Sequence, residues 1–361
     1  MWTLTIVRPF SVTVVAGAGG YFAPLIRAYI RRSGAPEDTG IRVALKDRKN
    51  ALKNPYTHLQ IPDIDFDTIA NSPMLWDPIR YLETCPTSDG ACAMVLASEE
   101  AAKKSPRPPA WIHATEMKSE PTMFSGRDQV NPQAGRDCAA SLYKKAGISD
   151  PRKELDVAEI YVPFSWFEPM WMENLGFAEE GSGWRMTYEG ATAMDGDMPI
   201  NCSGGVLSSN PIGASGMLRY AESAMQVRGQ AGEHQVDGAR KALGHAYGGG
   251  SQYYAMWIVG SEKPWSEGGS GHVRVGVVEL RPEGSLEVGP GVPGWDGGLE
   301  GRAFRFLQPA GARTAGSRPR ARRLCLRRDP ERTRDDRALP GGLPGGLVPE
   351  PDQPSPDRPG D

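Results

Sequence analysis

Strand and helix signals alternate between Trp111 and Lys263, and this alternation constrains the fold more than any other feature of the sequence. Apolar runs typical of strands occur at Trp111–Ala114, Val157–Val162 and Tyr253–Val259. Segments with helical periodicity, each followed by a glycine, lie between them at Asn131–Ala146 and Ser215–Arg228. The pattern predicts an α/β protein whose helices cover a sheet.

The chain before Trp111 carries similar signals. Two amphipathic helices are expected at Tyr21–Arg32 and Ile41–Leu52, the first ended by Gly34. A short helix is expected at Pro78–Leu82. The run Ala91–Leu96 is continuously apolar, which predicts a strand with both faces covered by helices.

The texture of the sequence changes after about Trp265. A short island at Val273–Leu280 is compatible with a strand or hairpin, but from about Gly291 Pro, Gly and Arg dominate. Such a composition cannot bury enough apolar surface to offset chain entropy, so a disordered tail is predicted at residues 266–361. The Arg-dense stretch Arg313–Arg337 is typical of a nucleic-acid arm, but the acidic residues mixed into it favour a disordered tail or a read-through of an altered frame.

Charge and cysteine content exclude several classes of protein. With 41 basic and 44 acidic residues the net charge is -3, which gives no global attraction to nucleic acid or an anionic membrane. No run reaches the roughly 18 apolar residues of a membrane span, and Arg8 and Pro9 interrupt the one N-terminal run that resembles a signal peptide. The 5 cysteines form no C-x-x-C pair, which favours a reducing compartment, so a cytoplasmic location is expected.

Four segments carry motifs that follow one another in a fixed order. They are DPIRYLETCPTSDGA at Asp77–Ala91, NCSGG and NPIGASG at Asn201–Gly205 and Asn210–Gly216, GHAYGGG at Gly244–Gly250, and the closing strand that ends at Trp257–Gly260. Each motif alone is weak, but their order and spacing over about Tyr21 to Pro264 resemble the thiolase superfamily. The resemblance is closest to its lipid-transfer, sterol-carrier-type branch, and within it to the thiolase-like aldolases of steroid side-chain degradation.

The resemblance implies a layered α/β/α/β/α architecture of two similar halves, with the N-terminal half incomplete here. Residues 1–120 would be the remainder of that half with its loop region, residues 121–265 the C-terminal domain, and residues 266–361 the tail. Two departures from the family pattern bear on the reaction. Asn210 stands where thiolases carry the His of H-P-x-G, and no cysteine precedes Cys85, although a condensing thiolase needs a cysteine nucleophile.

The second motif supplies candidate binding residues. A Pro-x-Gly-x-Ser-Gly loop that enters a helix directs free backbone N–H groups at a ligand. The resemblance therefore implies that Asn210, Gly213 and Ser215 surround a thioester, with the Asn210 amide as an oxyanion donor. Cys202 lies beside this candidate site, where a passive role is favoured over a nucleophilic one.

The third motif supplies candidate catalytic residues. Its glycines predict a crowded loop before the last strand, carrying two proton-transfer groups. The resemblance implies that Tyr247 transfers the proton, that His245 assists, and that the backbone N–H groups of Gly248 and Gly249 hold the enolate oxygen. The alternative is that these glycines only make tight turns.

Aromatic residues form a further cluster, in which Tyr161, Phe164, Trp166, Phe167, Trp171 and Trp184 occur close together. The cluster predicts either a wide apolar pocket for a polycyclic acyl group or an aromatic-rich core or subunit interface. His234 and His272 lie in loop-like sequence and are expected to be solvated. There is no helix-based metal motif, P-loop or dinucleotide fingerprint, so no metal site is predicted.

The function implied by the resemblance is retro-aldol cleavage of an acyl-CoA, which releases propionyl-CoA and a steroid ketone. Retro-aldol chemistry needs no acyl-enzyme, only a proton acceptor and groups that stabilise a thioester enolate. The alternatives are an acetyl-CoA acyltransferase (thiolase) and a non-catalytic acyl-CoA-binding or scaffold subunit. The resemblance further implies a homodimer, a small partner protein of the zinc-ribbon and OB-fold kind, and no cofactor beyond the coenzyme A thioester that is the substrate.

Overall fold

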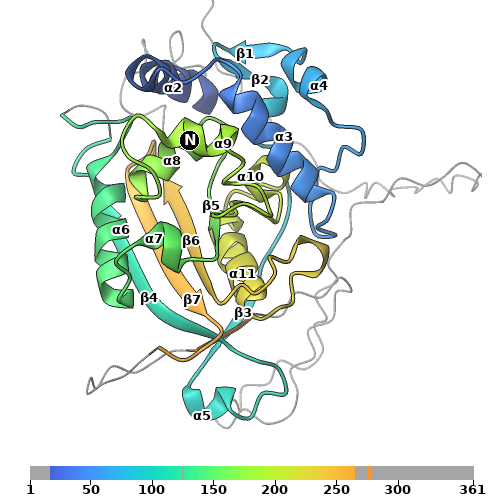
Figure 1. The fold of residues 1–361 in the computed structure, drawn as a ribbon, viewed down its shortest axis with the longest axis vertical. Coiled ribbons are helices and arrows are strands. Elements are labelled where there is room, and N and C mark those ends of the chain that lie inside the picture. Colours follow the sequence, from blue (N-terminus) through green and yellow to red (C-terminus); the bar gives the residue numbers. More distant parts are fainter. Residues whose placement is uncertain (1–16, 124–125, 265–274, 279–361) are drawn as a thin grey trace, which may run out of the picture. The chain divides into compact units, whose positions relative to one another are not determined.

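The structure is a computed structural model that describes residues 17–123, 126–264 and 275–278 (Figure 1). By its contacts the chain divides into two units, Met1–Phe306 and Leu307–Asp361, and every described residue lies in the first. The predicted tail at 266–361 therefore falls outside the described residues, except for the strand at 275–278. Within the described ranges no helix is long and apolar enough to cross a membrane.

A six-stranded sheet, with strand order β3-β8-β4-β7-β6-β5, organises the described residues. Its strands are β3 (Met94–Ala97), β4 (Ala110–Ser119), β5 (Val157–Ile160), β6 (Lys241–Gly248), β7 (Tyr253–Gly260) and β8 (Val275–Val278). Neighbouring strands are antiparallel except for β5, which runs parallel to β6. A two-stranded sheet of β1 (Met74–Trp76) and β2 (Ile79–Arg80) completes the pairing.

Helices cover both faces of the six-stranded sheet. The α-helices are α2 (Ala18–Ser33), α3 (Thr39–Ala51), α4 (Phe66–Ala70), α5 (Glu99–Ala102), α6 (Gln133–Ala146), α7 (Pro151–Glu154), α8 (Phe167–Asn174), α9 (Gly183–Tyr188), α10 (Gly205–Ser208) and α11 (Ser215–Val227), and the 3-10 helices are η2 (Tyr81–Glu83) and η3 (Gly232–His234). Successive residues of β7 point to opposite faces. Met256 and Ile258 belong to the core that contains α6 and α8, whereas Trp257 and Val259 belong to the core that contains α11. The result is an α/β/α arrangement around one sheet.

The helices and strands predicted in the alternating region are confirmed, and so is the helix predicted at Tyr21–Arg32, since local signals set where these helices end. Helix α2 ends at Gly34, which takes the left-handed conformation and donates its N–H to the carbonyl oxygen of Ile30 at 2.9 Å. Helix α6 ends in the same way at Gly147, with φ 68°. Both glycines adopt a conformation that costs other residues about 1–2 kcal/mol.

Two predictions before Trp111 are wrong. Ile79 and Arg80 form a strand instead of a helix, since they pair with β1, and the Glu83 carboxylate accepts the N–H of Arg80 at 3.0 Å. The strand predicted at Ala91–Leu96 begins only at Met94 and lies at the sheet edge, where it pairs with β8 alone. Its side chains are not covered on both faces, because Val95 is 61% exposed. In both cases the pairing with another strand, which the local sequence pattern does not record, determined the secondary structure.

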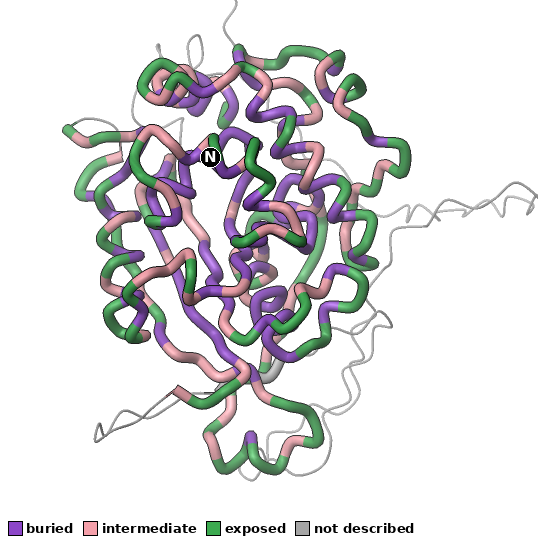
Figure 2. Tube along the Cα trace, viewed as in Figure 1, coloured by how far each residue is buried: buried purple, intermediate pink, exposed green. Residues whose placement is uncertain are grey.

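The aromatic cluster is core within the described residues. Trp166, Phe167 and Trp171 are all 0% exposed, and Figure 2 shows buried backbone along the central strands and the segments packed on them. Helix α8 is buried at every position, including its polar residues Glu168, Glu173 and Asn174. The cluster therefore serves as packing, and it forms one wall of the candidate site.

Candidate functional site

His245 and Tyr247 lie in strand β6, and the loop predicted at Gly244–Gly250 is wrong over its first five residues. Strand β6 pairs along its length with β7 and beside β5. Gly244 pairs with Trp257 in this ladder. The position requires glycine because a Cβ there would lie 1.8 Å from the indole nitrogen of Trp257. A glycine selected for close packing thus has the same sequence signal as a glycine selected for a turn.

Tyr247 projects into the aromatic wall. Its ring stacks on Phe167, with centroids 5.6 Å apart, and meets the ring of Tyr161 edge-on at 5.3 Å. Trp171 contacts it from a third side at 5.1 Å. Among the described residues no group hydrogen-bonds the Tyr247 hydroxyl, and burial raises its pKa well above the usual value. The hydroxyl is a neutral group that is available to a ligand.

Tyr161, which follows β5 directly, connects Tyr247 to the second motif. The Tyr161 hydroxyl donates to Oδ1 of Asn210 at 3.1 Å, and the Ser215 hydroxyl donates to the same oxygen at 2.7 Å. The Asn210 amide nitrogen donates to Sγ of Cys85 at 3.1 Å. Burial raises the pKa of Tyr161 to about 12 and also raises that of the Cys85 thiol. Asn210 is therefore the centre of a neutral network that includes two hydroxyls and a thiol.

The structure brings together three motif segments that are far apart in sequence. The Ser88 hydroxyl accepts the N–H of Asn210 at 3.0 Å, and a Cβ on Gly90 would lie 3.0 Å from the Pro211 ring. A Cβ on Gly216, at the start of α11, would lie 3.2 Å from that of Ala246 on β6. The first, second and third motifs thus meet around Asn210 and Tyr247.

His245 is not placed as a proton-transfer group. It is fully buried, and burial lowers its pKa to about 3, so the ring is neutral at physiological pH. Its Nδ1 accepts the backbone N–H of Tyr161 at 3.4 Å, which leaves the proton on Nε2. That Nε2 has no hydrogen-bond partner in the described part of the chain. In this geometry the side chain of His245 acts as a hydrogen-bond acceptor for the backbone of Tyr161.

Gly248 and Gly249 lie where β6 turns into β7. Gly249, Gly250 and Ser251 all take positive φ, at 58°, 62° and 61°. The Arg127 guanidinium donates to the carbonyl oxygens of Gly250 at 2.7 Å and Ser251 at 3.0 Å. These contacts hold the turn next to Tyr247. Gly248 and Gly249 therefore lie beside the residue with which they were predicted to act.

The remaining predicted residues are dispersed. Gly213 lies in an open turn where a Cβ would meet nothing within 4 Å. Cys202 is buried in the core on the α11 face of the sheet, whereas Tyr247 packs against the core on the opposite face. Burial raises the pKa of the Cys202 thiol. The structure therefore does not bring Cys202 to Tyr247.

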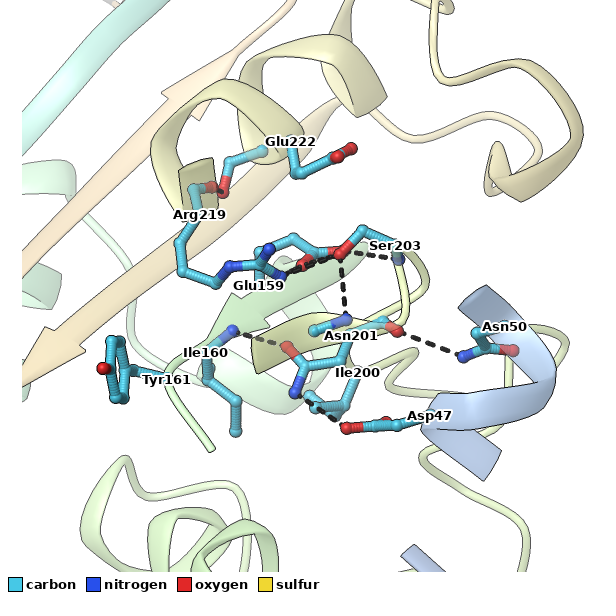
Figure 3. Close-up of polar contacts among 12 residues, drawn as sticks. Asp47, Asn50, Glu159, Ile160, Tyr161, Ile200, Asn201, Ser203, Arg219 and Glu222 are labelled. Carbon is cyan, nitrogen blue, oxygen red and sulfur yellow. Dashed lines mark hydrogen bonds and ion pairs between the residues drawn. The ribbon is translucent and has the colours of Figure 1, made fainter. Parts of the chain in front are cut away.

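Buried charges behind the site are absent from the sequence predictions. The Glu159 carboxylate pairs with Arg219 and accepts the Ser203 hydroxyl at 2.7 Å (Figure 3). His234, predicted to be solvated, is 1% exposed, and its Nε2 lies 2.9 Å from the Glu222 carboxylate. A charged residue inside an apolar strand, as Glu159 is, was the available signal. Likewise, a phenol directly after that strand was the signal for Tyr161.

No metal site is found in the described ranges, where no group of three or more His, Cys, Asp or Glu residues could hold an ion. An open hollow of about 630 Å³ lies elsewhere, lined mainly by Asp150, Arg152, Lys153, Asp156, Asp197 and Asp237. It shares no residue with the network around Asn210. Its charges pair with one another, as in Arg152–Asp197 and Lys153–Asp150, so its position does not mark the chemistry.

Comparisons with known proteins agree with this geometry. Residues 116–261 match the family described as thiolase C-terminal domain-like. Acetyl-CoA acetyltransferase of Methanothermobacter thermautotrophicus is 31% identical over 63% of this chain and 59% of its own length, and sterol carrier protein 2 of Oryctolagus cuniculus is 33% identical over 65% and 44%. The chain therefore spans about half the length of the curated relatives it matches. A solved structure, the Ltp2-ChsH2(DUF35) aldolase, is 26% identical with a TM-score of 0.60 over 70% of this chain and 65% of its own.

Proposed function

This chain belongs to the thiolase superfamily, and on that premise we propose that it binds an acyl-CoA thioester and cleaves a carbon–carbon bond of the acyl group by a retro-aldol reaction. The proposed substrate is a 3-hydroxyacyl thioester whose hydroxyl carbon belongs to a steroid ring, and the products are a steroid ketone and propionyl-CoA. The observation that carries the proposal is the Tyr247 hydroxyl, which has no hydrogen bond to any described residue, on a ring that packs against Tyr161 of the Tyr161–Asn210 pair.

The protonation of the site favours this reaction over acyl transfer. Acyl transfer to the enzyme requires a thiolate. Burial raises the pKa of every cysteine in the described residues, to about 11 for Cys92 and about 12 for Cys138. Hydrogen-bonding hydroxyls and an amide are instead suited to hold an enolate oxygen and to move protons without a net charge.

The proposed step balances with one bifunctional phenol. The oxygen of Tyr247 accepts the proton of the substrate hydroxyl as the bond between the α and β carbons breaks. The electron pair of that bond passes to the α carbon, and the hydroxyl carbon becomes the ketone. Tyr247 delivers its own proton to the α carbon, which gives the propionyl thioester. Since one proton enters as another leaves, the phenol never needs to be ionised in a buried site.

The Tyr161–Asn210 pair would assist by binding oxygen. The Asn210 amide nitrogen carries two hydrogens, of which Cys85 accepts one at 3.1 Å. The second hydrogen is a donor for the thioester oxygen as it gains charge. Gly248 and Gly249 supply further N–H groups at the turn held by Arg127.

The experiment is a cleavage assay with a 17-hydroxy steroid side-chain CoA ester, in which propionyl-CoA is measured for wild type, Tyr247→Phe and Tyr161→Phe. We expect Tyr247→Phe to lose about 10²-fold or more in kcat, since it removes proton transfer, and Tyr161→Phe to lose less. Tyr220→Phe is the matched control, because its hydroxyl is buried with no hydrogen-bond partner among the described residues and its ring packs on Trp257, away from Tyr247.

Two other outcomes separate the rival functions. Thiolysis or acetyl transfer that depends on a cysteine would indicate an acyltransferase. A folded chain that binds the ester but releases nothing, with or without a partner, would indicate a binding subunit. The assay includes a partner of the zinc-ribbon and OB-fold kind because the name of the similar solved structure, the Ltp2-ChsH2(DUF35) aldolase, joins two proteins. A homodimer and a cytoplasmic location stay predictions.

A further inference from the structure

The backbone around Tyr161 is held by side chains instead of by a strand partner. The ladder between β5 and β6 ends at Ile160 and His245. One residue later, the N–H of Tyr161 donates to Nδ1 of His245 at 3.4 Å, and its carbonyl oxygen accepts the indole N–H of Trp171 at 3.0 Å. The chain leaves the sheet here, yet the peptide groups of Tyr161 stay paired inside the core.

Asn201 supplies the third contact from the other side of β5. A single bridge joins Ala158 to Ile200, and the N–H of Asn201 donates to the carbonyl oxygen of Ala158 at 2.9 Å. Asn201 then turns into the left-handed region, with φ 53°, and its Oδ1 accepts the N–H of Ile160 at 2.8 Å (Figure 3). The side chain thus takes the place of the next backbone acceptor in a ladder.

Buried groups fix Asn201 in its turn. Its amide nitrogen faces the Asp47 carboxylate at 3.4 Å, and Asn50 donates to its carbonyl oxygen at 3.2 Å. Asp47 lies 2.9 Å from Nζ of Lys46, which also donates to the carbonyl oxygen of Ile200 at 2.8 Å. Asp47 and Asn201 are both 0% exposed, so this arrangement has no freedom to reach solvent.

We propose that the side chains of Asn201, His245 and Trp171, here called the Tyr161 clamp, are positioning residues that set where the Tyr161 hydroxyl lies relative to Asn210 and Tyr247. The inference rests on the proposed function only for its catalytic consequence. A left-handed asparagine, an uncharged histidine and a core tryptophan share no catalytic chemistry. What they share is a hydrogen bond to one of three successive peptide units, which begin at the N–H of Ile160 and end at the carbonyl oxygen of Tyr161.

The test replaces Tyr161 with 3-fluorotyrosine and follows the ionisation of this phenol by ¹⁹F NMR. The clamp is opened by Asn201→Gly, because glycine takes positive φ without strain and removes only the side-chain contacts. We expect the midpoint of the titration to fall by about one pH unit or more toward that of the free amino acid, as the phenol leaves its buried place. Asn50→Ala is the matched control, since it removes a buried amide that contacts Asn201 but not the peptides of Tyr161, and it should leave the midpoint within about 0.3 units.

Trp171→Phe is the second variant, which keeps an aromatic ring and removes the donor to the carbonyl oxygen of Tyr161. It carries the test if Asn201→Gly does not fold, and we expect a shift in the same direction. Unchanged titration in a folded clamp variant overturns the inference whatever the activity. Shifted titration with no aldolase activity in any form of the protein keeps the inference and rejects the proposed function. If both hold, kcat falls about tenfold while KM for the ester changes less than about threefold.

Discussion

Tyr161, Tyr247, Asn210, Cys85 and Ser215 form a site without a formal charge. Each titratable member has its pKa moved away from neutrality by burial. A site of this kind stabilises a developing oxyanion through donors that are already oriented and already dry. The sequence predicted Tyr247 and Asn210 by motif, but it left Tyr161 in the aromatic cluster and did not include Cys85 among the candidate site residues.

The first prediction concerns the pH dependence of cleavage. Tyr161 has a pKa of about 12 and His245 a pKa of about 3, so neither titrates near neutrality. We expect kcat to change less than about twofold between roughly pH 6.5 and 8.5, measured with the steroid ester. A mechanism that uses a thiolate would instead rise over this range, since an ordinary cysteine titrates near about 8.5.

The second prediction uses His245 as a probe of stability. Its pKa in the folded state lies below that in the unfolded chain, where it is about 6.5. Below about pH 6.5 the unfolded chain gains a proton that the folded chain does not, so the contribution of His245 falls as the pH falls. The difference in unfolding free energy between wild type and His245→Asn should shrink by about 1.4 kcal/mol per pH unit from pH 6.5 to 5, measured by urea denaturation.

The third prediction concerns His234 and has the opposite sign. Burial alone would lower its pKa, but the Glu222 carboxylate at 2.9 Å raises it above the usual value. The folded chain therefore keeps a proton that the unfolded chain has lost above about pH 6.5. The advantage of wild type over His234→Gln should be complete below about pH 6.5 and should decline as the pH rises above it. A flat difference across that range would contradict the pairing.

At the scale of elements, the helices that end at a glycine were predictable, whereas the short element at Ile79–Arg80 and strand β6 were not. The ends of α2 and α6 depend on the glycine that directly follows each helix, which a local pattern records. Strand β6 was taken for a loop because its glycines also fit a turn. It is a strand because it pairs with β7, where Gly244 lies opposite Trp257, and sequence alone does not place these two residues side by side.

The fourth prediction tests that glycine. Gly244→Ala would force its Cβ to within 1.8 Å of the Trp257 ring, so we expect a loss of about 2 kcal/mol or more in unfolding free energy. Gly248→Ala is the control on the same strand, where a Cβ meets nothing within 4 Å, and it should change stability by less than about 1 kcal/mol. Equal effects in thermal or urea melts would mean that Gly244 is not packed as described.

The fifth prediction concerns the edge strand β3. Val95 and Leu96 are 61% and 58% exposed, on a strand whose one partner among the described residues is β8. Exposed apolar edge strands promote association between chains. We expect Val95→Lys to reduce light scattering on concentration while changing unfolding free energy by less than about 0.5 kcal/mol. Increased scattering would assign Val95 a packing role instead.

At the scale of the whole molecule, the predicted thiolase-like layered α/β fold is confirmed by the family match at residues 116–261 and the similar aldolase structure. The described residues contain one six-stranded sheet of the two expected for two halves. Alternation of strands and helices was enough to predict the fold class. The site was harder, since Cys85, Tyr161, Asn210 and Tyr247 meet only when the whole chain is folded.

The ion pair of Glu159 with Arg219 has a consequence for how such a chain can change over evolutionary time. The two residues are 60 positions apart in the sequence and both are buried, and the guanidinium of Arg219 donates a hydrogen bond to the carboxylate of Glu159. Replacing either one alone leaves an unpaired charge in the interior, which lowers the unfolding free energy by about 3–5 kcal/mol. Replacing both with apolar residues is often tolerated. The two positions are therefore inherited as a unit. Related sequences should keep both residues or lose both, and intermediates with only one should be rare.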